Sequence, residues 1–307
     1  DFLNKLFDNL NKVVNKKKSR ISLILSFSNE ENNIESFVGG IRFFENHITI
    51  SLINLSQSEI REFANLIKSK EISTIFVDTD KKLPFQVFAS KENNIGKVEY
   101  SNTIAEVTDL FKEFKIIPFS STQLTVSSVI GNLHGIFGPN LSGKKVSLIG
   151  LGSIGFQLSL NLIREGVSIN AFTRNYDLGL VKCNCINLVK SEYTIANISL
   201  FRDLRTTILS SNIMLECTNA SNLYNLNFID EINSQEQIIA VGKRAFNSDI
   251  LHKIKDNLNI KRLDVSDEIF KMVFDSRDKF HELIKPKKRN YFGKILISGG
   301  WKGQKMK

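Results

Sequence analysis

Cysteine, proline, histidine and tryptophan are scarce in this chain of 307 residues, which has three Cys, four Pro, four His and one Trp. Three cysteines exclude a disulfide framework and are typical of a reducing compartment, so we expect a cytoplasmic protein. They are also too scattered for a zinc-type cluster, and no metal site is expected. No apolar run approaches the roughly 20 residues of a membrane helix, and charged residues interrupt the first 14 residues, so we expect neither a membrane span nor a signal peptide.

Positive charge is concentrated at the two ends of the chain, whose formal net charge is +9. Residues 1–20 hold six Lys/Arg and two Asp, and residues 285–307 hold eight Lys/Arg and no acid, so the remaining 264 residues sum to −3. No aromatic-interleaved basic repeat accompanies this charge, and the pattern does not favour nucleic acid as a partner. Two interpretations stay open: solvated ends, or attraction of a small phosphorylated or carboxylate ligand.

Length and composition favour a soluble globular protein of about two domains, with 42% hydrophobic and 24% charged residues. We expect a smaller N-terminal α/β domain over residues 1–138 and a nucleotide-binding domain over residues 139–270. A basic segment, residues 271–307, is expected to return over the domain interface. The boundary is placed near Pro139, in the linker 135–143.

Hydrophobic periodicity predicts the elements of both domains. An amphipathic helix over residues 2–14 docks on its own domain or, alternatively, binds a partner or a membrane surface. In the second half strands and helices alternate, which predicts right-handed crossovers and a parallel sheet with ligands at the carboxyl ends of its strands. The predicted strands are 21–27, 47–55, 72–77, 146–149, 168–173, 184–188, 213–217, 237–241 and 260–265, and residues 116–119 are a short strand or a loop. The predicted helices are 59–68, 99–114, 122–133, 156–165, 199–210, 227–232 and 248–257.

A glycine-rich turn lies between a predicted strand and a predicted helix, in the sequence Gly150-Leu-Gly-Ser-Ile-Gly155. Gly150 permits the tight turn, Gly152 lets a pyrophosphate approach the backbone, and Gly155 lets the helix pack on the strand. The phosphates would sit on the N–H groups of the helix that begins near Ser153. The competing interpretations are a structural turn and a site for another nucleotide. The predicted loop residues are Gly150, Gly152, Ser153, Ile154 and Gly155.

The end of the following strand indicates which dinucleotide is bound. An NAD site has an acidic side chain there for the ribose hydroxyls, whereas hydroxyl and guanidinium groups suit a 2′-phosphate. The chain reads Asn170-Ala-Phe-Thr-Arg-Asn175, with no carboxylate. Thr173 and Arg174 therefore favour NADP over NAD, although NAD is possible. The alternative is that Arg174 only faces solvent beside the adenine.

Residues 141–268 resemble the cofactor domain of the D-2-hydroxyacid dehydrogenases. This resemblance implies a Rossmann fold, a nicotinamide cofactor, and a basic residue that holds the substrate carboxylate, here Lys243 or Arg244. The family's proton-transferring histidine has no counterpart, because no histidine follows His281. The matching segments are the glycine turn with Leu141-Ser-Gly-Lys-Lys145 before it, Asn227-Phe-Ile-Asp-Glu-Ile232, Ile238-Ile-Ala-Val-Gly-Lys-Arg244 and Arg262-Leu-Asp-Val265.

The order of the domains is similar to that of shikimate-type and amino-acid dehydrogenases, in which a compact N-terminal domain leads through a helix into the cofactor domain. This second resemblance implies a substrate in the cleft between domains and a lysine that acts as acid or base. The signature Asn-Val-Thr-x-Pro-x-Lys of the shikimate enzymes is absent from the chain. The analogy is one of layout only.

Residues at predicted strand ends supply the catalytic candidates. Lys243 and Arg244 hold the anionic substrate or are a surface pair. Asp264 contacts the cofactor carboxamide, or it caps a helix or lies at the edge of the core. His134 is the histidine best placed for proton transfer, or it is structural. Residues expected to line the nicotinamide end are Cys217, Thr218, Asn219 and Gly242.

The pattern as a whole predicts an α/β protein: a doubly wound parallel sheet of the Rossmann type with a smaller N-terminal α/β domain. We expect an NADPH-dependent oxidoreductase that transfers hydride to a carbonyl or imine of a small anionic metabolite, and a homo-oligomer. Two alternatives stay open: a non-catalytic nucleotide sensor, and a subunit of a complex. Cys183 and Cys185, on the predicted strand 184–188, are interpreted as two buried small hydrophobes rather than metal ligands.

Overall fold

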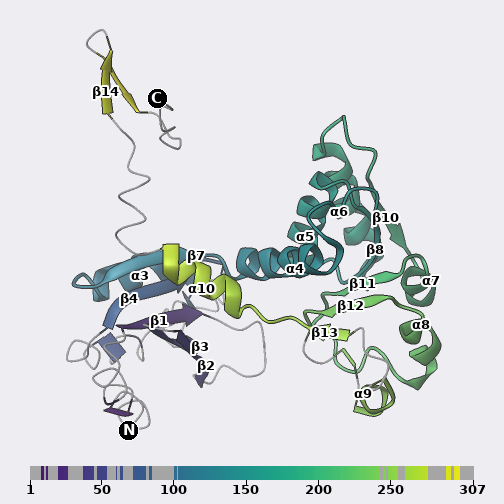
Figure 1. Cartoon of the computed structure of the whole chain (residues 1–307), viewed down its shortest axis with the longest axis horizontal. Coiled ribbons are helices and arrows are strands. Elements are labelled where there is room, and N and C mark those ends of the chain that lie inside the picture. Colours follow the sequence, from purple (N-terminus) through teal and green to yellow (C-terminus); the bar gives the residue numbers. More distant parts are fainter. Residues whose placement is uncertain are drawn as a thin grey trace, which may run out of the picture. The chain divides into compact units, whose positions relative to one another are not determined.

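The chain folds into two compact units, one formed by residues 1–119 with 266–307 and the other by residues 120–265 (Figure 1). Among the helices that the structure describes, none is both long and apolar enough to cross a bilayer. The computed structural model describes residues 8–9, 12, 20–26, 37–44, 47–53, 60, 63–64, 72–80, 83–84, 100–101, 103–242, 245–246, 248–254, 260–275, 288–291 and 294–297.

The first unit is built on a mostly parallel five-stranded sheet. Its strand order is β2(Phe37–Phe44), β3(His47–Ile53), β1(Arg20–Ser26), β4(Ile72–Asp78) and β7(Lys115–Phe119). Neighbouring strands pair in parallel, except that β2 pairs antiparallel with β3. Strands β1, β3 and β4 are buried almost throughout and more than half of their residues are apolar, as expected of parallel strands covered on both faces. Edge strand β2 was not predicted, because its sequence lies after a polar loop and includes two glycines.

Helix α3(Thr103–Leu110) contributes to the core of this unit, through Val107 and the following Phe111. The helix predicted over 99–114 starts later, because residues 100–101 pair as strand β6(Tyr100–Ser101) with β5(Leu83–Pro84). Helix α10(Ser266–Asp275) belongs to this unit. The remaining described pair is the hairpin β14(Lys288–Tyr291) and β15(Lys294–Ile297). Most of the predicted helix 2–14 and of the predicted basic segment lies outside the described residues.

The second unit contains a six-stranded sheet in which every neighbouring pair is parallel. Numbered within the unit, the strands lie in the order 3-2-1-4-5-6, which is the order of the Rossmann fold. The predicted fold class is confirmed by this order. In space the strands are β10(Ile198–Phe201), β9(Ser168–Phe172), β8(Lys145–Ile149), β11(Ile213–Glu216), β12(Gln237–Ala240) and β13(Ile260–Arg262).

Helix α4(Ser121–Phe137) lies in the second unit, whereas the sequence placed its residues in the N-terminal domain. Val126, Val129 and Leu133 of α4 join the core cluster that contains Leu148 of β8. Ser120 caps the helix by accepting from the Gln123 N–H at 3.0 Å. The other helical segments of this unit are α5(Ser153–Arg164), α6(Tyr176–Val189), α7(Leu204–Leu209), η1(Leu226–Phe228), α8(Ile229–Asn233) and α9(Ser248–Ile254).

The predicted strand 184–188 is wrong, because these residues form the second half of helix α6. The Asn175 side chain caps this helix by accepting from the Leu178 N–H at 3.0 Å. Cys183 is buried and Cys185 is exposed, so the two thiols do not share a buried face. The predicted helix 199–210 is also wrong in its first part, which is strand β10, and the helix starts after Asp203 as α7.

Candidate functional site

The glycine-rich turn connects β8 to α5, and two of its glycines are required by close packing. Gly150 has a φ of +101°, and a Cβ on it would lie 2.9 Å from the Cys217 carbonyl carbon. A Cβ on Gly155 would overlap the Gly150 carbonyl oxygen. Gly150 also donates to the Phe172 carbonyl at 2.8 Å, which fixes the turn between β8 and β9. The backbone therefore turns sharply at the carboxyl edge of the sheet, at the end of its first strand.

Gly152 differs from the other two glycines because a Cβ there would meet no atom within 4 Å. It occupies the N-cap position of α5, and no side chain caps the helix that begins at Ser153. No acidic residue lies in the first turn, which also contains Ile154. The first N–H groups of a helix have no partner within the helix and carry its positive dipole end. The turn thus combines open space with N–H donors, which is what a pyrophosphate requires.

Lys182 of α6 supports this turn from the side. Its Nζ donates to the Leu151 carbonyl at 2.7 Å, between the first two glycines. This contact joins α6 to the loop and brings a positive charge to it. Lys182 could not be recognised from the sequence, because the residue is 31 positions away from its partner.

Two arginines follow the ends of the neighbouring strands β9 and β10. The strands pair with Phe172 opposite Phe201, so Thr173 and Arg202 leave the sheet side by side. Arg174 is exposed. The Arg202 guanidinium carbon lies 3.8 Å from the centroid of the Tyr176 ring, a cation–π contact that fixes its position. Arg174 is a candidate from the sequence, whereas Arg202 is not, since only the pairing of β9 with β10 brings Arg202 next to Thr173.

Glu216, the last residue of β11, is a fully buried carboxylate at the same edge of the sheet. Its Oε1 accepts from the Thr218 N–H at 2.8 Å and its Oε2 from the Gly242 N–H at 3.0 Å. Burial raises the pKa of this carboxyl, and the two backbone donors oppose that shift. Glu216 therefore ties the end of β11 to the end of β12. An acidic residue closing an apolar strand was the available sequence signal, and it was missed.

The predicted nicotinamide-end residues lie around this carboxylate. A Cβ on Gly242 would overlap both Glu216 Oε2 and the Thr218 carbonyl, so only glycine fits there. Cys217 donates its N–H to the Ile149 carbonyl at 2.8 Å. Desolvation of its thiol and the nearby Glu216 charge raise its pKa well above the usual range, so it is a poor nucleophile. Thr218 is partly buried and Asn219 is exposed.

The catalytic candidates are not gathered at one point in the described structure. Lys243 and Arg244 lie outside the described residues. His134 Nε2 lies 3.0 Å from Glu165 Oε2, and Glu165 is the C-cap of α5. That end of α5 is about 18 Å from Ser153 at 1.5 Å per residue, so His134 does not reach the glycine turn. Asp264 follows β13, and its carbonyl accepts from Ser128 Oγ of α4 at 2.7 Å.

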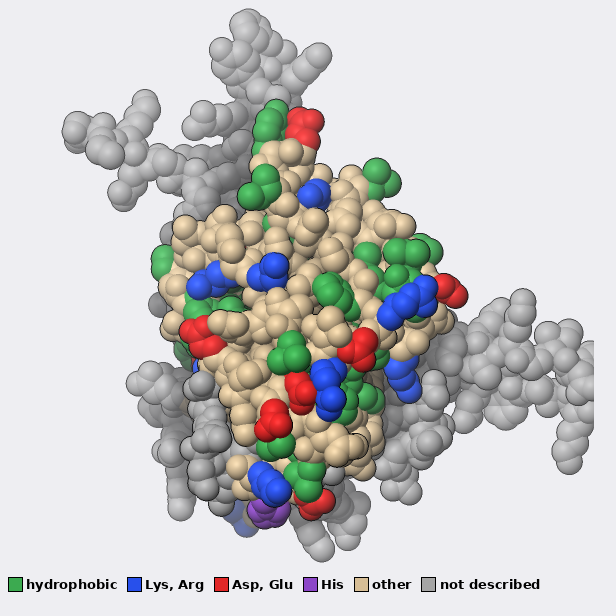
Figure 2. Space-filling view, turned by 90° about the vertical axis from the view of Figure 1, so that its right-hand side faces the viewer, with side chains coloured by type: hydrophobic (Ala, Val, Ile, Leu, Met, Phe, Trp, Pro, Cys, Tyr) green, Lys and Arg blue, Asp and Glu red, His purple; other side chains and the backbone are tan. Residues whose placement is uncertain are grey.

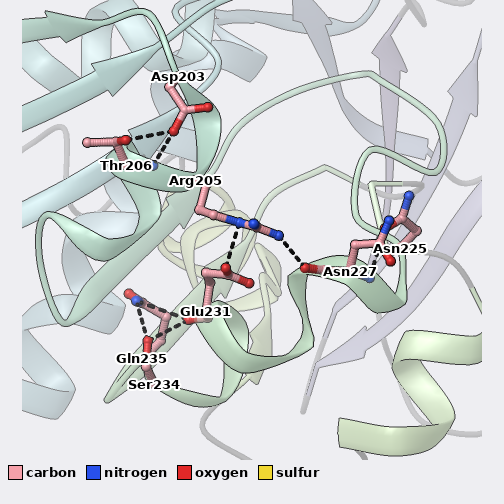
Figure 3. Close-up of polar contacts among 8 residues, drawn as sticks. All are labelled: Asp203, Arg205, Thr206, Asn225, Asn227, Glu231, Ser234 and Gln235. Carbon is pink, nitrogen blue, oxygen red and sulfur yellow. Dashed lines mark hydrogen bonds and ion pairs between the residues drawn. The ribbon is translucent and has the colours of Figure 1, made fainter.

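A separate group of polar contacts joins α7 to η1 and α8 (Figure 3). Arg205 Nε lies 2.6 Å from Glu231 Oε1, and another guanidinium nitrogen of Arg205 donates to the Asn227 carbonyl at 2.6 Å. Asp203 caps α7 by accepting from the N–H and the hydroxyl of Thr206, which lowers its pKa. These contacts stabilise the packing of short helices. Within the part of the chain that the structure describes, no group of His, Cys, Asp and Glu is suited to a metal ion.

No family model matches the chain, and no curated protein does. Solved structures do match it. L-tryptophan dehydrogenase from Nostoc punctiforme matches 87% of this chain and 79% of its own, with 10% identity and a TM-score of 0.47. Shikimate 5-dehydrogenase from Listeria monocytogenes, solved with shikimate and NAD, matches 82% and 88%, with 13% identity and a TM-score of 0.42. A D-isomer-specific 2-hydroxyacid dehydrogenase family protein from Aeromonas salmonicida matches 80% and 82%, with 10% identity and a TM-score of 0.35.

Proposed function

We propose that the second unit binds a nicotinamide dinucleotide and that the protein is an oxidoreductase. The observation that carries this proposal is the turn at Gly152, which has open space above an uncapped helix N-terminus. The turn follows the first strand of a sheet with the Rossmann order, where dinucleotides bind across the carboxyl edge. The backbone N–H groups near Ser153 would hold the pyrophosphate, and Lys182 would keep the loop in place.

The cofactor that the adenosine end favours is NADP. None of the three residues directly after β9, Thr173, Arg174 and Asn175, has a carboxylate, and the Asn175 side chain is occupied as the cap of α6. Arg174 and Arg202 would bind the 2′-phosphate from two sides, since guanidinium groups pair well with phosphate. Thr173 contributes a hydroxyl next to them. Arg202 is already positioned by Tyr176, which reduces the ordering cost of binding.

The nicotinamide end would lie against Cys217, Thr218, Asn219 and Gly242. When bound, the nicotinamide supplies the hydride. The chain's own part is to hold the ring against the substrate, and Glu216 keeps the two strand ends that do so in register. We propose that Lys243 or Arg244, next to Gly242 in sequence, binds the anionic group of a small carbonyl or imine substrate.

The experiment that tests this proposal substitutes Gly152→Ala and measures NADPH binding by calorimetry. The added methyl meets no protein atom, so the variant should fold normally, while the methyl should obstruct the pyrophosphate. We expect at least a tenfold loss of affinity. The control is Gly135→Ala, since a Cβ on Gly135 also meets nothing within 4 Å. Equal NADPH affinity in Gly152→Ala and the control would contradict the proposal.

A further inference from the structure

Helix α6 carries apolar side chains on two faces, although its sheet uses only one. Gly179, Cys183 and Ile186 are buried and face the unit's own core. A second set of apolar residues, here called the α6 outer stripe, is exposed. At about 100° per residue it spans roughly 100° of the helix circumference. Its members are Leu178, Val181, Cys185, Leu188 and Val189.

The outer stripe is highly exposed: 51% for Leu178, 58% for Val181, 85% for Leu188 and 67% for Val189. Single exposed apolar side chains are common on protein surfaces. Figure 2 shows one face of the molecule, on which apolar side chains form small groups among charged ones. A continuous apolar stripe along one helix differs from such scattered side chains. A helix that is apolar on opposite sides is normally buried on both sides.

The lysine of α6 and the lysine at its C-cap do not cover the outer stripe, because their ammonium groups bind backbone carbonyls. Lys182 Nζ donates to the Leu151 carbonyl at 2.7 Å, and Lys190 Nζ donates to the Ala196 carbonyl at 2.6 Å. Beyond the helix, Tyr193 and Ile195 add exposed apolar surface, at 90% and 98%. The face is therefore an apolar surface whose nearby cations are already engaged.

The spacing of the stripe fits a second copy of the same helix as its partner. The gaps from Leu178 to Val181, Cys185 and Leu188 are three, four and three residues, a pattern that is the same in both directions. An antiparallel second copy of α6, centred near residue 183, therefore brings Leu178 opposite Leu188 and Val181 opposite Cys185. Two-fold interfaces of this kind require a self-complementary surface.

The available area agrees with a dimer. At about 150 Å² for each fully exposed large apolar side chain, the stripe with Tyr193 and Ile195 offers on the order of 700 Å². A standard interface buries roughly 800 Å² on each partner. We propose that the protein forms a two-fold dimer through antiparallel packing of the α6 outer stripe. This inference does not depend on the proposed function.

The oligomeric state of the full chain tests the proposal. Light scattering after gel filtration should give the mass of a dimer for the native protein and of a monomer for Leu188→Glu. Leu209→Glu is the control, because Leu209 is also exposed but lies at the end of α7, and it should stay dimeric. Circular dichroism melting curves of both variants show whether they are folded. A monomeric native protein, or a dimer that Leu188→Glu leaves intact, would overturn the proposal.

A cross-link tests the register separately. In Val181→Cys, the new thiol should lie opposite Cys185 of the second copy, and mild oxidation with copper phenanthroline should give a covalent dimer. Adding Cys185→Ser should remove the cross-link while the dimer persists. If Val181→Cys is dimeric in solution and folded but does not cross-link, the antiparallel register is overturned.

Discussion

Glu216 Oε2 accepts a hydrogen bond from the Gly242 N–H at 3.0 Å, which joins the ends of two adjacent parallel strands through a buried carboxylate. The same side chain accepts from Thr218. These residues follow β11 and β12 at the carboxyl edge of the sheet, where ligands of doubly wound proteins bind. The contact therefore defines the shape of the proposed nicotinamide end, and several expected outcomes depend on it.

Gly242→Ala should destabilise the protein, because the new methyl would overlap Glu216 Oε2 and the Thr218 carbonyl. We expect a loss of about 1–3 kcal/mol in the free energy of unfolding, the usual cost of overpacking. NADPH affinity should fall as well, since the strand ends must separate. Urea denaturation and calorimetry measure the two effects. Unchanged stability would mean that Glu216 does not occupy its position beside Gly242.

The free energy of unfolding should depend on pH through the titration of Glu216. Burial raises its pKa in the folded protein above the unfolded value, so the folded state binds more protons between the two pKa values. The contribution of Glu216 to the free energy of unfolding is therefore greatest below the ordinary glutamate pKa. This contribution is lost as pH rises through the higher pKa of the folded state. In urea denaturation from pH 4 to 7, the native protein should lose stability relative to Glu216→Gln, which has no titrating group. A constant or growing difference in favour of the native protein would contradict this account.

Arg174→Asp should change cofactor preference. Replacing a guanidinium with a carboxylate repels a 2′-phosphate and suits the ribose hydroxyls of NAD. NADPH affinity should fall by roughly 10- to 100-fold, the scale of a lost charged hydrogen bond, while NADH affinity is kept or improved. Equal losses for both cofactors would mean that Arg174 is not at the 2′ position.

Arg202→Ala should weaken NADPH binding by about tenfold, because it removes the second guanidinium and its contact with Tyr176. NADH binding should change little. The matched control is Arg164→Ala, in the last turn of α5, at the end of that helix away from the glycine turn. Calorimetric titration of both variants separates a phosphate contact from a general loss of positive charge.

Lys182→Met should loosen the glycine turn by removing the donor to the Leu151 carbonyl while keeping an apolar side chain of similar length. A net loss of about 1 kcal/mol is typical of one hydrogen bond and corresponds to roughly fivefold weaker cofactor binding. The effect should be similar for NADPH and NADH, because the loop faces the pyrophosphate common to both. A loss confined to NADPH would instead place Lys182 at the 2′-phosphate.

The glycine turn was predictable from sequence because its constraints are local. The left-handed φ of Gly150 and the start of α5 at Ser153 follow from residues within a few positions of one another. The parallel strands were equally clear, because burial on both faces makes them short apolar runs. Strand β8 and its helix α5 show both signals in succession.

Long-range contacts account for what the sequence did not indicate. Residues 184–188 of helix α6 were predicted as a strand because the residues of α6 are apolar on both faces, which removes the helical period from the pattern. Lys182 and Arg202 contact partners on other elements, and no local motif marks them. Glu216 has one local signal, an acidic residue at the end of an apolar strand, but its partner Gly242 is 26 positions away. The sequence left His134 as either the proton-transferring or a structural histidine, and only the structure shows its Nε2 beside Glu165, at the far end of α5 from the glycine turn.

The most direct test of the central claim is calorimetric titration of the full chain with NADPH, NADP, NADH and NAD. The account predicts tight binding of NADPH and NADP and much weaker binding of NADH and NAD. The glycine turn would bind the pyrophosphate of all four, whereas the two arginines would bind only the 2′-phosphate of NADPH and NADP. Absence of binding by all four would contradict the account, because the turn at Gly152 would then have only a structural role.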